Sequence, residues 1–288
     1  MGTFKKILFP TDFSENSDQA LSHAMGLIDF RDSELIVQHV VNDYFERTPH
    51  WTTLFDIREL QIHLDSFVER EMTGTLRSIS DGVHVRKVIS KGRPAEEICA
   101  LAEKEFVDLV IMGSAAGAVT NNLIRTTTRP VLAVSSRLPA SAGTGAAKRI
   151  LVATDFSEHS RRIAKYAFDI RKAVGATIYL LHVIETTKSI EFALKQGHYM
   201  DATERMKEWA MNQLLNLIPD ESLNDPGVIR MVEIGKVSKR IPDVARKIEA
   251  DLTVLGAHEY GTIHKTFLGT TTDRMLSTLD SPMLTVRI

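Results

Sequence analysis

Glycines and threonines near the C-terminal end of the chain have the types and spacing of an anion site. Gly256 ends a short apolar, β-branched run that begins at Leu252, and Gly269 directly precedes Thr270 and Thr271 at the start of a helical pattern. Glycine lets a backbone approach a ligand closely, and the free N–H groups and dipole of a helix N-terminus favour phosphate. The stretch is a candidate phosphate cradle, although such a stretch in isolation is more often a βα connection whose glycines only make turns.

The chain contains a second copy of the elements around this stretch, and this duplication strengthens the interpretation as a phosphate cradle. The Thr-Asp-Phe-Ser motif of residues 11–14 returns at 154–157, and the His-Val pair of 39–40 returns at 182–183, at one constant offset. Similarity at a fixed offset is the signature of a duplicated structural unit. The chain is therefore interpreted as two tandem repeats.

The two copies differ in length at one place. The offset holds as far as Gly113 and is larger from Pro130 onward, so the first copy has lost residues between these two positions. With the larger offset, Ala118 of the first copy pairs with Thr270 of the second. The deletion removes the glycine-bounded loop itself, and we expect no phosphate site in the first repeat.

Short apolar runs alternate with helical patterns through both copies. Strands are predicted at 4–10, 35–41, 83–89, 107–112, 131–134, 149–154, 177–183, 228–233, 252–255 and 283–287. Helices are predicted near 15–30, 56–79, 92–105, 119–128, 158–174, 200–217, 238–249 and 270–279. This alternation indicates an α/β fold with parallel strands and helices on both faces of the sheet.

Ligands of such sheets lie beyond the carboxyl ends of the strands. Asp155 follows the first strand of the second copy and Gly256 follows the fourth, so both would lie on this edge. We expect two domains, residues 1–136 and 148–288, joined by a linker at 137–147 that is rich in small residues and lacks a periodic pattern.

Composition excludes several classes of protein. The net charge of −2 gives no case for a nucleic-acid or anionic-membrane partner. No apolar run approaches the ~20 residues of a membrane span, and no secretory signal is visible. The single cysteine, Cys99, lies in an apolar helical pattern that suits a core residue. We expect a soluble protein of the cytoplasm.

The sequence shows no catalytic set. His39 and His182 end the second strand of each copy with no nucleophile beside them, so a structural role is predicted for both. His258, Glu259 and His264 lack the helical i, i+4 spacing of a zinc site. We therefore expect no metal centre and no catalytic residue, and any ATP hydrolysis would be slow and incidental.

The combination of motifs resembles the universal stress protein family. A strand followed by Thr-Asp-Phe-Ser, a His-Val pair ending the second strand, and a glycine after the fourth strand followed by a loop and Gly-Thr are similar to that family twice, over nearly the whole chain. The resemblance implies two tandem adenine-nucleotide-binding-like (Rossmann-like) domains, each a five-stranded parallel sheet with helices on both faces. It also implies self-association through the final strands, so that 131–134 and 283–288 pair within one chain.

The resemblance also implies a ligand site in the second repeat. ATP-binding members carry Gly-x2-Gly-x9-Gly-Ser/Thr after strand four, and an aspartate after strand one and a valine of strand two hold adenine and ribose. An adenine nucleotide such as ATP or AMP, with Mg²⁺ accompanying it, would then be held by Ala153, Asp155, Val183, Leu255, Gly256, Gly269, Thr270 and Thr271. The second glycine of the motif is replaced by Glu259, whose charge would oppose a triphosphate.

Two functions of different classes remain open from the sequence. The first is a stress-response protein that binds an adenine nucleotide in its C-terminal repeat as a sensor or regulator. The alternative is an interaction module with both sites degenerate, acting on a protein partner through dimer surfaces; Glu259 and the deletion favour it. The long second helices and the segments before them carry large apolar residues, which more commonly pack on their own sheet than bind a partner: Trp51, Phe55, Phe67, Phe192, Tyr199, Met206 and Trp209.

Overall fold

The computed structural model describes residues 4–27, 33–42, 57–79, 82–114, 118–135, 147–157, 160–186, 200–257 and 270–287. The strands are β1 (Lys6–Pro10), β2 (Glu34–Val41), β3 (His84–Lys91), β4 (Leu109–Ser114), β5 (Val131–Ser135), β6 (Arg149–Thr154), β7 (Thr177–Glu185), β8 (Val228–Gly235), β9 (Leu252–Ala257) and β10 (Met283–Arg287). The helices are α1 (Glu15–Leu27), α4 (Ile57–Ser78), α5 (Pro94–Lys104), α6 (Ala118–Thr126), α7 (Ser160–Val174), α9 (Met200–Leu215), α10 (Val237–Lys247) and α11 (Thr270–Thr278), with a 3₁₀ turn η1 (Asp220–Ser222).

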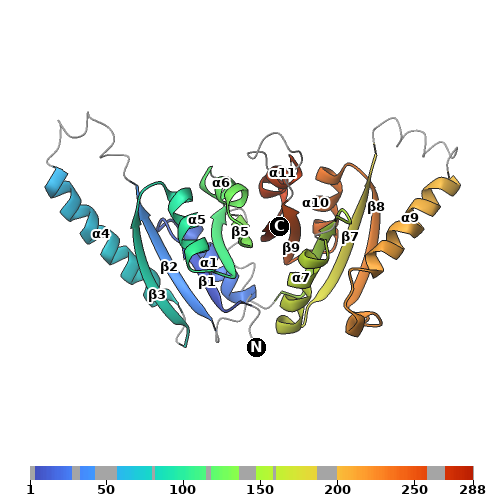
Figure 1. Cartoon of the computed structure of the whole chain (residues 1–288), viewed down its shortest axis with the longest axis horizontal. Helices are drawn as coiled ribbons and strands as arrows, with labels where there is room; N and C mark the ends of the chain where they lie inside the picture. The colour runs from blue at the N-terminus through green and yellow to red at the C-terminus, as the bar shows by residue number, and fades with distance from the viewer. Residues whose placement is uncertain are drawn as a thin grey trace.

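The strands form one continuous ten-stranded sheet in the order β3-β2-β1-β4-β5-β10-β9-β6-β7-β8 (Figure 1). Within each repeat the neighbouring strands are parallel. The two repeats meet where β5 and β10 pair antiparallel, with Leu132 opposite Leu284. The predicted pairing of the final strands within one chain is therefore confirmed. Because neighbouring strands also twist, strands β2 and β7, each next to an edge strand, both end toward the top of Figure 1.

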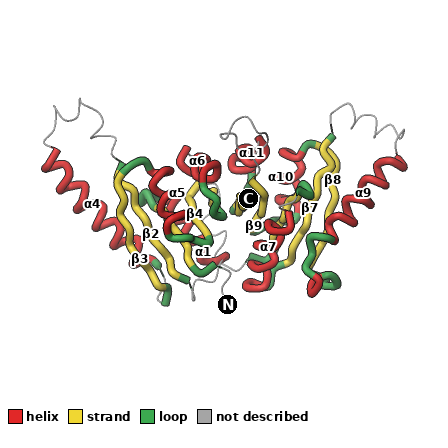
Figure 2. The backbone as a smooth tube through the Cα atoms, viewed as in Figure 1, coloured by secondary structure: helices red, strands yellow, loops and turns green. Residues whose placement is uncertain are grey.

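Successive strand residues point to opposite faces, and each face is covered by a layer of helices (Figure 2). On β1, Ile7 and Phe9 join the core cluster under α1, α4, α7 and α9, whereas Leu8 joins the cluster under α5, α6, α10 and α11. Burial on both faces explains why the strands read as continuous apolar runs. Both clusters contain residues of both repeats, and the rings of Phe4 and Tyr166 stack across the joint at 6.4 Å.

The predicted helices and strands agree with the structure to within a few residues at their ends. The helix predicted to run from 200 to 217 ends at Leu215, and η1 follows before β8. Proline at position 219 fixes its own φ and removes a backbone donor, so the helix cannot continue through this stretch. Residues 137–146 of the linker and Trp51, Phe55, Phe192 and Tyr199 lie outside the described residues.

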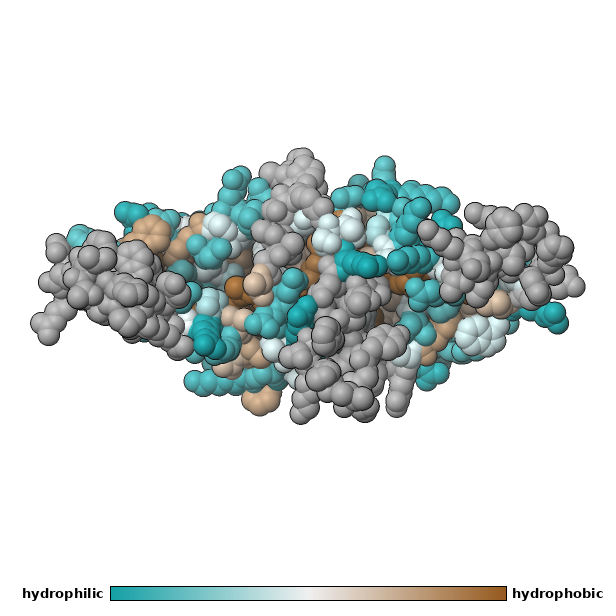
Figure 3. Space-filling view, turned by 90° about the horizontal axis from the view of Figure 1, so that it is seen from above, coloured by the Kyte–Doolittle hydropathy of each residue, from teal (hydrophilic) through white to brown (hydrophobic). Residues whose placement is uncertain are grey.

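Seen from above, hydrophilic side chains cover much of the described surface, and hydrophobic ones form smaller patches (Figure 3). Among the large apolar side chains, Phe67 is 45%, Met206 47% and Trp209 55% exposed. These three side chains are therefore only partly covered by their own sheet, which is less burial than expected. None of the helices described here combines the length and apolarity needed to cross a membrane.

Candidate functional site

Three of the predicted site residues meet where β6, β7 and β9 end. Ala153 on β6 pairs directly with Leu255 on β9, and β7 is the neighbour of β6 on its other side. Ala153, Leu255 and Val183 of β7 are 9%, 5% and 8% exposed, and all three belong to the apolar cluster under α10 and α11. The parallel register thus gathers residues that are distant in sequence into one apolar floor at the carboxyl edge of the sheet.

Asp155 lies in the turn between β6 and α7 and is exposed at this edge. Its Oδ1 accepts hydrogen bonds from the Ser157 backbone N–H at 3.0 Å and from Ser160 Oγ at 3.5 Å. The hydroxyl of Ser160 also accepts a hydrogen bond from Thr154 Oγ1 at 2.8 Å. Asp155 therefore orders the start of α7 while its carboxylate stays accessible beside the apolar floor.

The equivalent carboxylate of the first repeat, Asp12, accepts a similar set of hydrogen bonds. Its Oδ1 accepts from the Ser14 N–H at 3.0 Å, from Ser14 Oγ at 2.5 Å and from Ser17 Oγ at 2.6 Å. Burial raises the pKa of Asp12, but the hydrogen bonds from Ser14 and Ser17 outweigh it and leave this pKa below its usual value. This carboxylate serves the N-terminus of α1.

The two strand-ending histidines have the structural role that was predicted. His182 Nδ1 donates to the Thr154 carbonyl oxygen at 2.9 Å, as His39 Nδ1 does to the Thr11 carbonyl oxygen. Burial lowers the pKa of His182, and the Thr154 hydrogen bond and the Asp155 charge offset this only in part. This hydrogen bond fixes the tautomer with the proton on Nδ1 and holds each ring against the turn that follows the first strand of its repeat.

Sequence reasoning missed a pair of aromatic residues in the same turns. Phe13 and Phe156 both have φ of 61°, in the left-handed region that non-glycine residues rarely adopt. Each ring stacks on the strand-ending histidine of its repeat, and Phe156 also meets Trp209 of α9 edge-on at 5.5 Å. The return of a phenylalanine after the aspartate in both copies was the available signal.

Gly113 has a packing role in the first repeat. A Cβ on this residue would lie 2.8 Å from the backbone oxygen of Asn16, so the end of β4 touches the first turn of α1 directly. Helix α6 then begins at Ala118. The counterpart Gly256 lies half-buried on β9, which ends at Ala257.

Helix α11 begins at Thr270, the position that pairs with Ala118 in the repeat alignment. Thr270 and Thr271 therefore lie in its first turn, where free backbone N–H groups and the helix dipole favour an anion. The intervening residues 258–269, which include His258, Glu259, His264 and Gly269, lie outside the described residues. Within the described ranges, no cluster of three or more histidine, cysteine or acidic residues could hold a metal ion.

Comparison with known proteins gives consistent matches over both repeats. A model of the Universal stress protein family matches residues 3–135 and 146–287. A universal stress protein of Methanocaldococcus jannaschii is 31% identical over 156 residues, which cover 46% of this chain and 96% of that protein. A universal stress protein of Methanothermobacter thermautotrophicus is 28% identical over 130 residues, covering 45% of this chain and 88% of that protein.

Solved structures resemble the whole chain. The crystal structure of a universal stress protein from Archaeoglobus fulgidus covers 99% of this chain and aligns over 96% of its own, with 19% identity and a TM-score of 0.65. This likeness establishes the shared two-repeat fold. Another solved universal stress protein, which was crystallised with cAMP, aligns with 49% of this chain and 96% of its own at 18% identity and a TM-score of 0.34.

Proposed function

Since the chain belongs to the universal stress protein family, we propose that it is a stress-response protein of the cytoplasm whose second repeat binds an adenine nucleotide. The nucleotide is ATP or AMP, with Mg²⁺ as its counterion, and the protein acts as a sensor or regulator rather than as an enzyme. The observation that carries the proposal is the apolar floor of Ala153, Val183 and Leu255, with the Asp155 carboxylate beside it.

The floor supplies what the nucleoside part of such a ligand requires. A purine ring is flat and largely apolar, and the buried side chains of Val183 and Leu255 offer a dry surface for it. Asp155 offers an exposed acceptor for ribose hydroxyls. Gly256 and the first turn of α11, with Thr270 and Thr271, offer backbone N–H groups to the phosphates. We assign Gly269 to the same site because it directly precedes Thr270 in the sequence.

The first repeat does not supply the same set. The first copy has lost residues between Gly113 and Pro130, where the second copy carries its glycine-bounded loop. The position of Thr270 is taken by Ala118, which begins α6. We therefore assign one nucleotide equivalent to each chain.

A protein-interaction module is the second candidate function. Leu64 and Phe67 on α4, and Met206 and Trp209 on α9, are exposed apolar pairs with i, i+3 spacing at matching places in the two repeats. Two such surfaces would suit an unidentified protein partner. This candidate predicts no nucleotide binding by either repeat.

The test uses matched variants at the starts of α11 and α6. Thr270→Asp and Ala118→Asp each place a carboxylate in a first helical turn, where it favours the helix and repels a phosphate. Isothermal titration of ATP, with and without Mg²⁺, should show one equivalent for the wild type and for Ala118→Asp. Binding by Thr270→Asp should weaken at least about tenfold, which corresponds to about 1.4 kcal/mol.

Two outcomes would count against the proposal. Absence of ATP and AMP binding by the wild type at millimolar concentration would remove it and favour the interaction module. If Thr270→Asp bound ATP as tightly as the wild type, the phosphates would not lie at the N-terminus of α11. A thermal melt of each variant checks that the fold is retained.

A further inference from the structure

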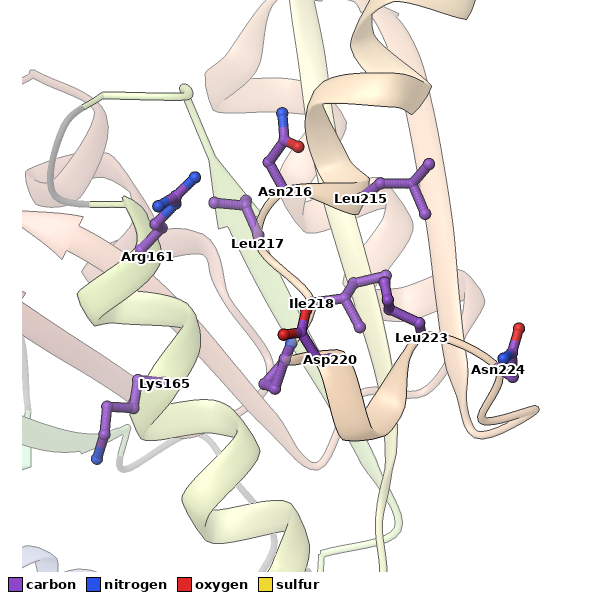
Figure 4. A pocket seen from close by; sticks show the side chains of 10 residues that line it. Arg161, Lys165, Leu215, Asn216, Leu217, Ile218, Asp220, Leu223 and Asn224 are labelled. Carbon is purple, nitrogen blue, oxygen red and sulfur yellow. The ribbon is translucent and has the colours of Figure 1, made fainter.

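The second repeat has a hollow of about 730 Å³ between α7 and the chain that follows α9 (Figure 4). It is lined by Arg161, Lys165, Leu215, Asn216, Leu217, Ile218, Pro219, Asp220, Leu223 and Asn224. Its volume falls within the range of small-molecule sites. Three of its apolar residues, Leu217, Ile218 and Pro219, are contiguous in the chain, and charged residues line it from both α7 and the chain after α9.

The hollow belongs to a stretch where the two repeats differ. In the first repeat α4 continues to Ser78, and β3 begins at His84. In the second repeat α9 ends at Leu215 and a longer connection, residues 216–227, leads to β8. The positions of Arg161 and Lys165 on α7 are also occupied differently, since their counterparts on α1 are an aspartate and a serine.

Two ion pairs fix this connection to α7. Arg171 Nη2 lies 2.7 Å from Asp225 Oδ2, and Lys172 Nζ lies 3.0 Å from Glu221 Oε1. A Cβ on Gly227 would lie only 2.6 Å from Arg171 Nη2, so the glycine lets the guanidinium pack closely against this connection. These ion pairs connect the two segments that line the hollow.

Arg161 and Asp220 present opposite charges to the hollow. The Arg161 side chain extends toward Leu217, and the Asp220 carboxylate is directed toward α7 (Figure 4). Lys165 is engaged elsewhere, with its Nζ 2.8 Å from Asp169 Oδ2. Among the described residues, neither the Arg161 guanidinium nor the Asp220 carboxylate has an ion-pair partner.

We propose that this hollow binds a small zwitterion with an apolar body, namely a short apolar peptide or a free apolar amino acid. The ligand carboxylate pairs with Arg161, whose planar guanidinium matches carboxylate geometry. The ligand ammonium pairs with Asp220, and the apolar body covers Leu217 and Ile218. A purely anionic or purely cationic ligand would meet one like charge, so a zwitterion is the class that satisfies both groups. The proposal is independent of nucleotide binding.

The test removes one charge at a time from ligand and protein. The full-length protein is titrated by calorimetry with L-leucyl-L-leucine, with its C-terminal amide and with its N-acetyl form. Arg161→Gln should weaken the free dipeptide about three- to fivefold, as expected for an exposed ion pair, and leave the amide unchanged. Asp220→Asn should weaken the free dipeptide similarly and leave the N-acetyl form unchanged.

The matched control is Arg162→Gln, because Arg162 is exposed and adjacent but does not line the hollow. It should bind the dipeptide as the wild type does. L-leucine alone separates the two sources: a dipeptide that binds about tenfold more tightly identifies a peptide site, and equal or tighter leucine binding identifies an amino-acid site. Absence of binding by both at about 20 mM, equal losses in Arg161→Gln and Arg162→Gln, or blocked ligands that bind as tightly as the free dipeptide would each overturn the proposal.

Discussion

Phe156 lies face to face with His182, with ring centroids 4.1 Å apart, and Phe13 and His39 repeat the arrangement at 4.3 Å in the first repeat. Both phenylalanines hold a left-handed backbone conformation. Such a conformation costs roughly 1–2 kcal/mol for a residue with a Cβ. Its presence in both copies indicates that the stacked ring compensates for the strain and fixes the turn that carries Asp155.

Two substitutions at Phe156 distinguish the effect of the stacked ring on stability from the effect of the left-handed backbone strain. Phe156→Ala removes the stack and keeps the Cβ, so it should lower the free energy of unfolding by about 2 kcal/mol. Phe156→Gly also removes the stack but relieves the left-handed strain, so it should be more stable than the alanine variant by about 1 kcal/mol. Urea unfolding measures both. A glycine variant less stable than the alanine variant would show that the backbone is unstrained.

Gly113 and Gly74 form a matched pair for the glycine argument. A Cβ at Gly113 would meet the Asn16 backbone at 2.8 Å, so Gly113→Ala should destabilise by about 1–3 kcal/mol. A Cβ at Gly74, inside α4, would meet nothing within 4 Å, so Gly74→Ala should stabilise by about 1 kcal/mol. Thermal unfolding compares the two variants, and equal effects would contradict the predicted contact between β4 and α1.

His23 should make stability depend on pH below neutrality. The residue is 3% exposed, its Nε2 is buried without a hydrogen-bond partner, and burial lowers its pKa from the ordinary 6.5. Well above pH 6.5 the ring is neutral in both the folded and the unfolded state. As pH falls through 6.5, the unfolded chain binds a proton at this residue and the folded chain does not, so stability decreases until the lowered pKa is passed.

The variant His23→Leu should lose less stability than the wild type between about pH 7.5 and about pH 5.5. Some dependence should remain, because burial lowers the pKa of His182 as well. The control His63→Gln changes an exposed histidine of α4 and should follow the wild type. Chemical unfolding at the two pH values decides; parallel curves for the wild type and His23→Leu would exclude His23 as a source.

The two repeats should stay together when the linker is cut. They share the antiparallel β5–β10 pairing, in which Leu132 and Leu284 are 2% and 1% exposed, and Thr285 Oγ1 donates to the Val131 carbonyl oxygen. After cleavage at a protease site inserted between 137 and 146, the halves should co-elute in gel filtration. Cleaved Leu132→Lys should separate, since a buried unpaired ammonium cannot be accommodated. Separation of the cleaved wild type would show that the linker holds the repeats together.

Much of the fold could be predicted from the sequence because strands that are buried on both faces appear as continuous apolar runs. Strands such as β1 and β6 are continuous apolar runs, and the duplication placed β10 and α11 correctly through the larger offset after Gly113. The end of α9 was predicted at about residue 217 and lies at Leu215, because the apolar pattern continues through Leu217 and Ile218 beyond the end of the helix.

The candidate site was less accessible to sequence reasoning. Ala153, Val183 and Leu255 could be placed together only by assuming the strand order, which the register of β6 with β7 and β9 now supplies. The roles of Asp12 and Gly113 depend on contacts with the first turns of α1, which no periodic pattern specifies. The left-handed Phe156 was invisible because residue type alone argues against that conformation.

The single antiparallel joint between β5 and β10 has a consequence for recognition at a distance. Strands β5 and β10 run in opposite directions where they pair. Twist of ~20–25° per strand accumulates to about a quarter turn across each repeat. Strands β2 and β7 therefore end on the same side of the molecule. A partner that binds the strand ends of one repeat can therefore contact those of the other repeat from the same side. If such a partner binds both repeats weakly, the sheet links the two binding surfaces. The second contact then forms at a high effective concentration.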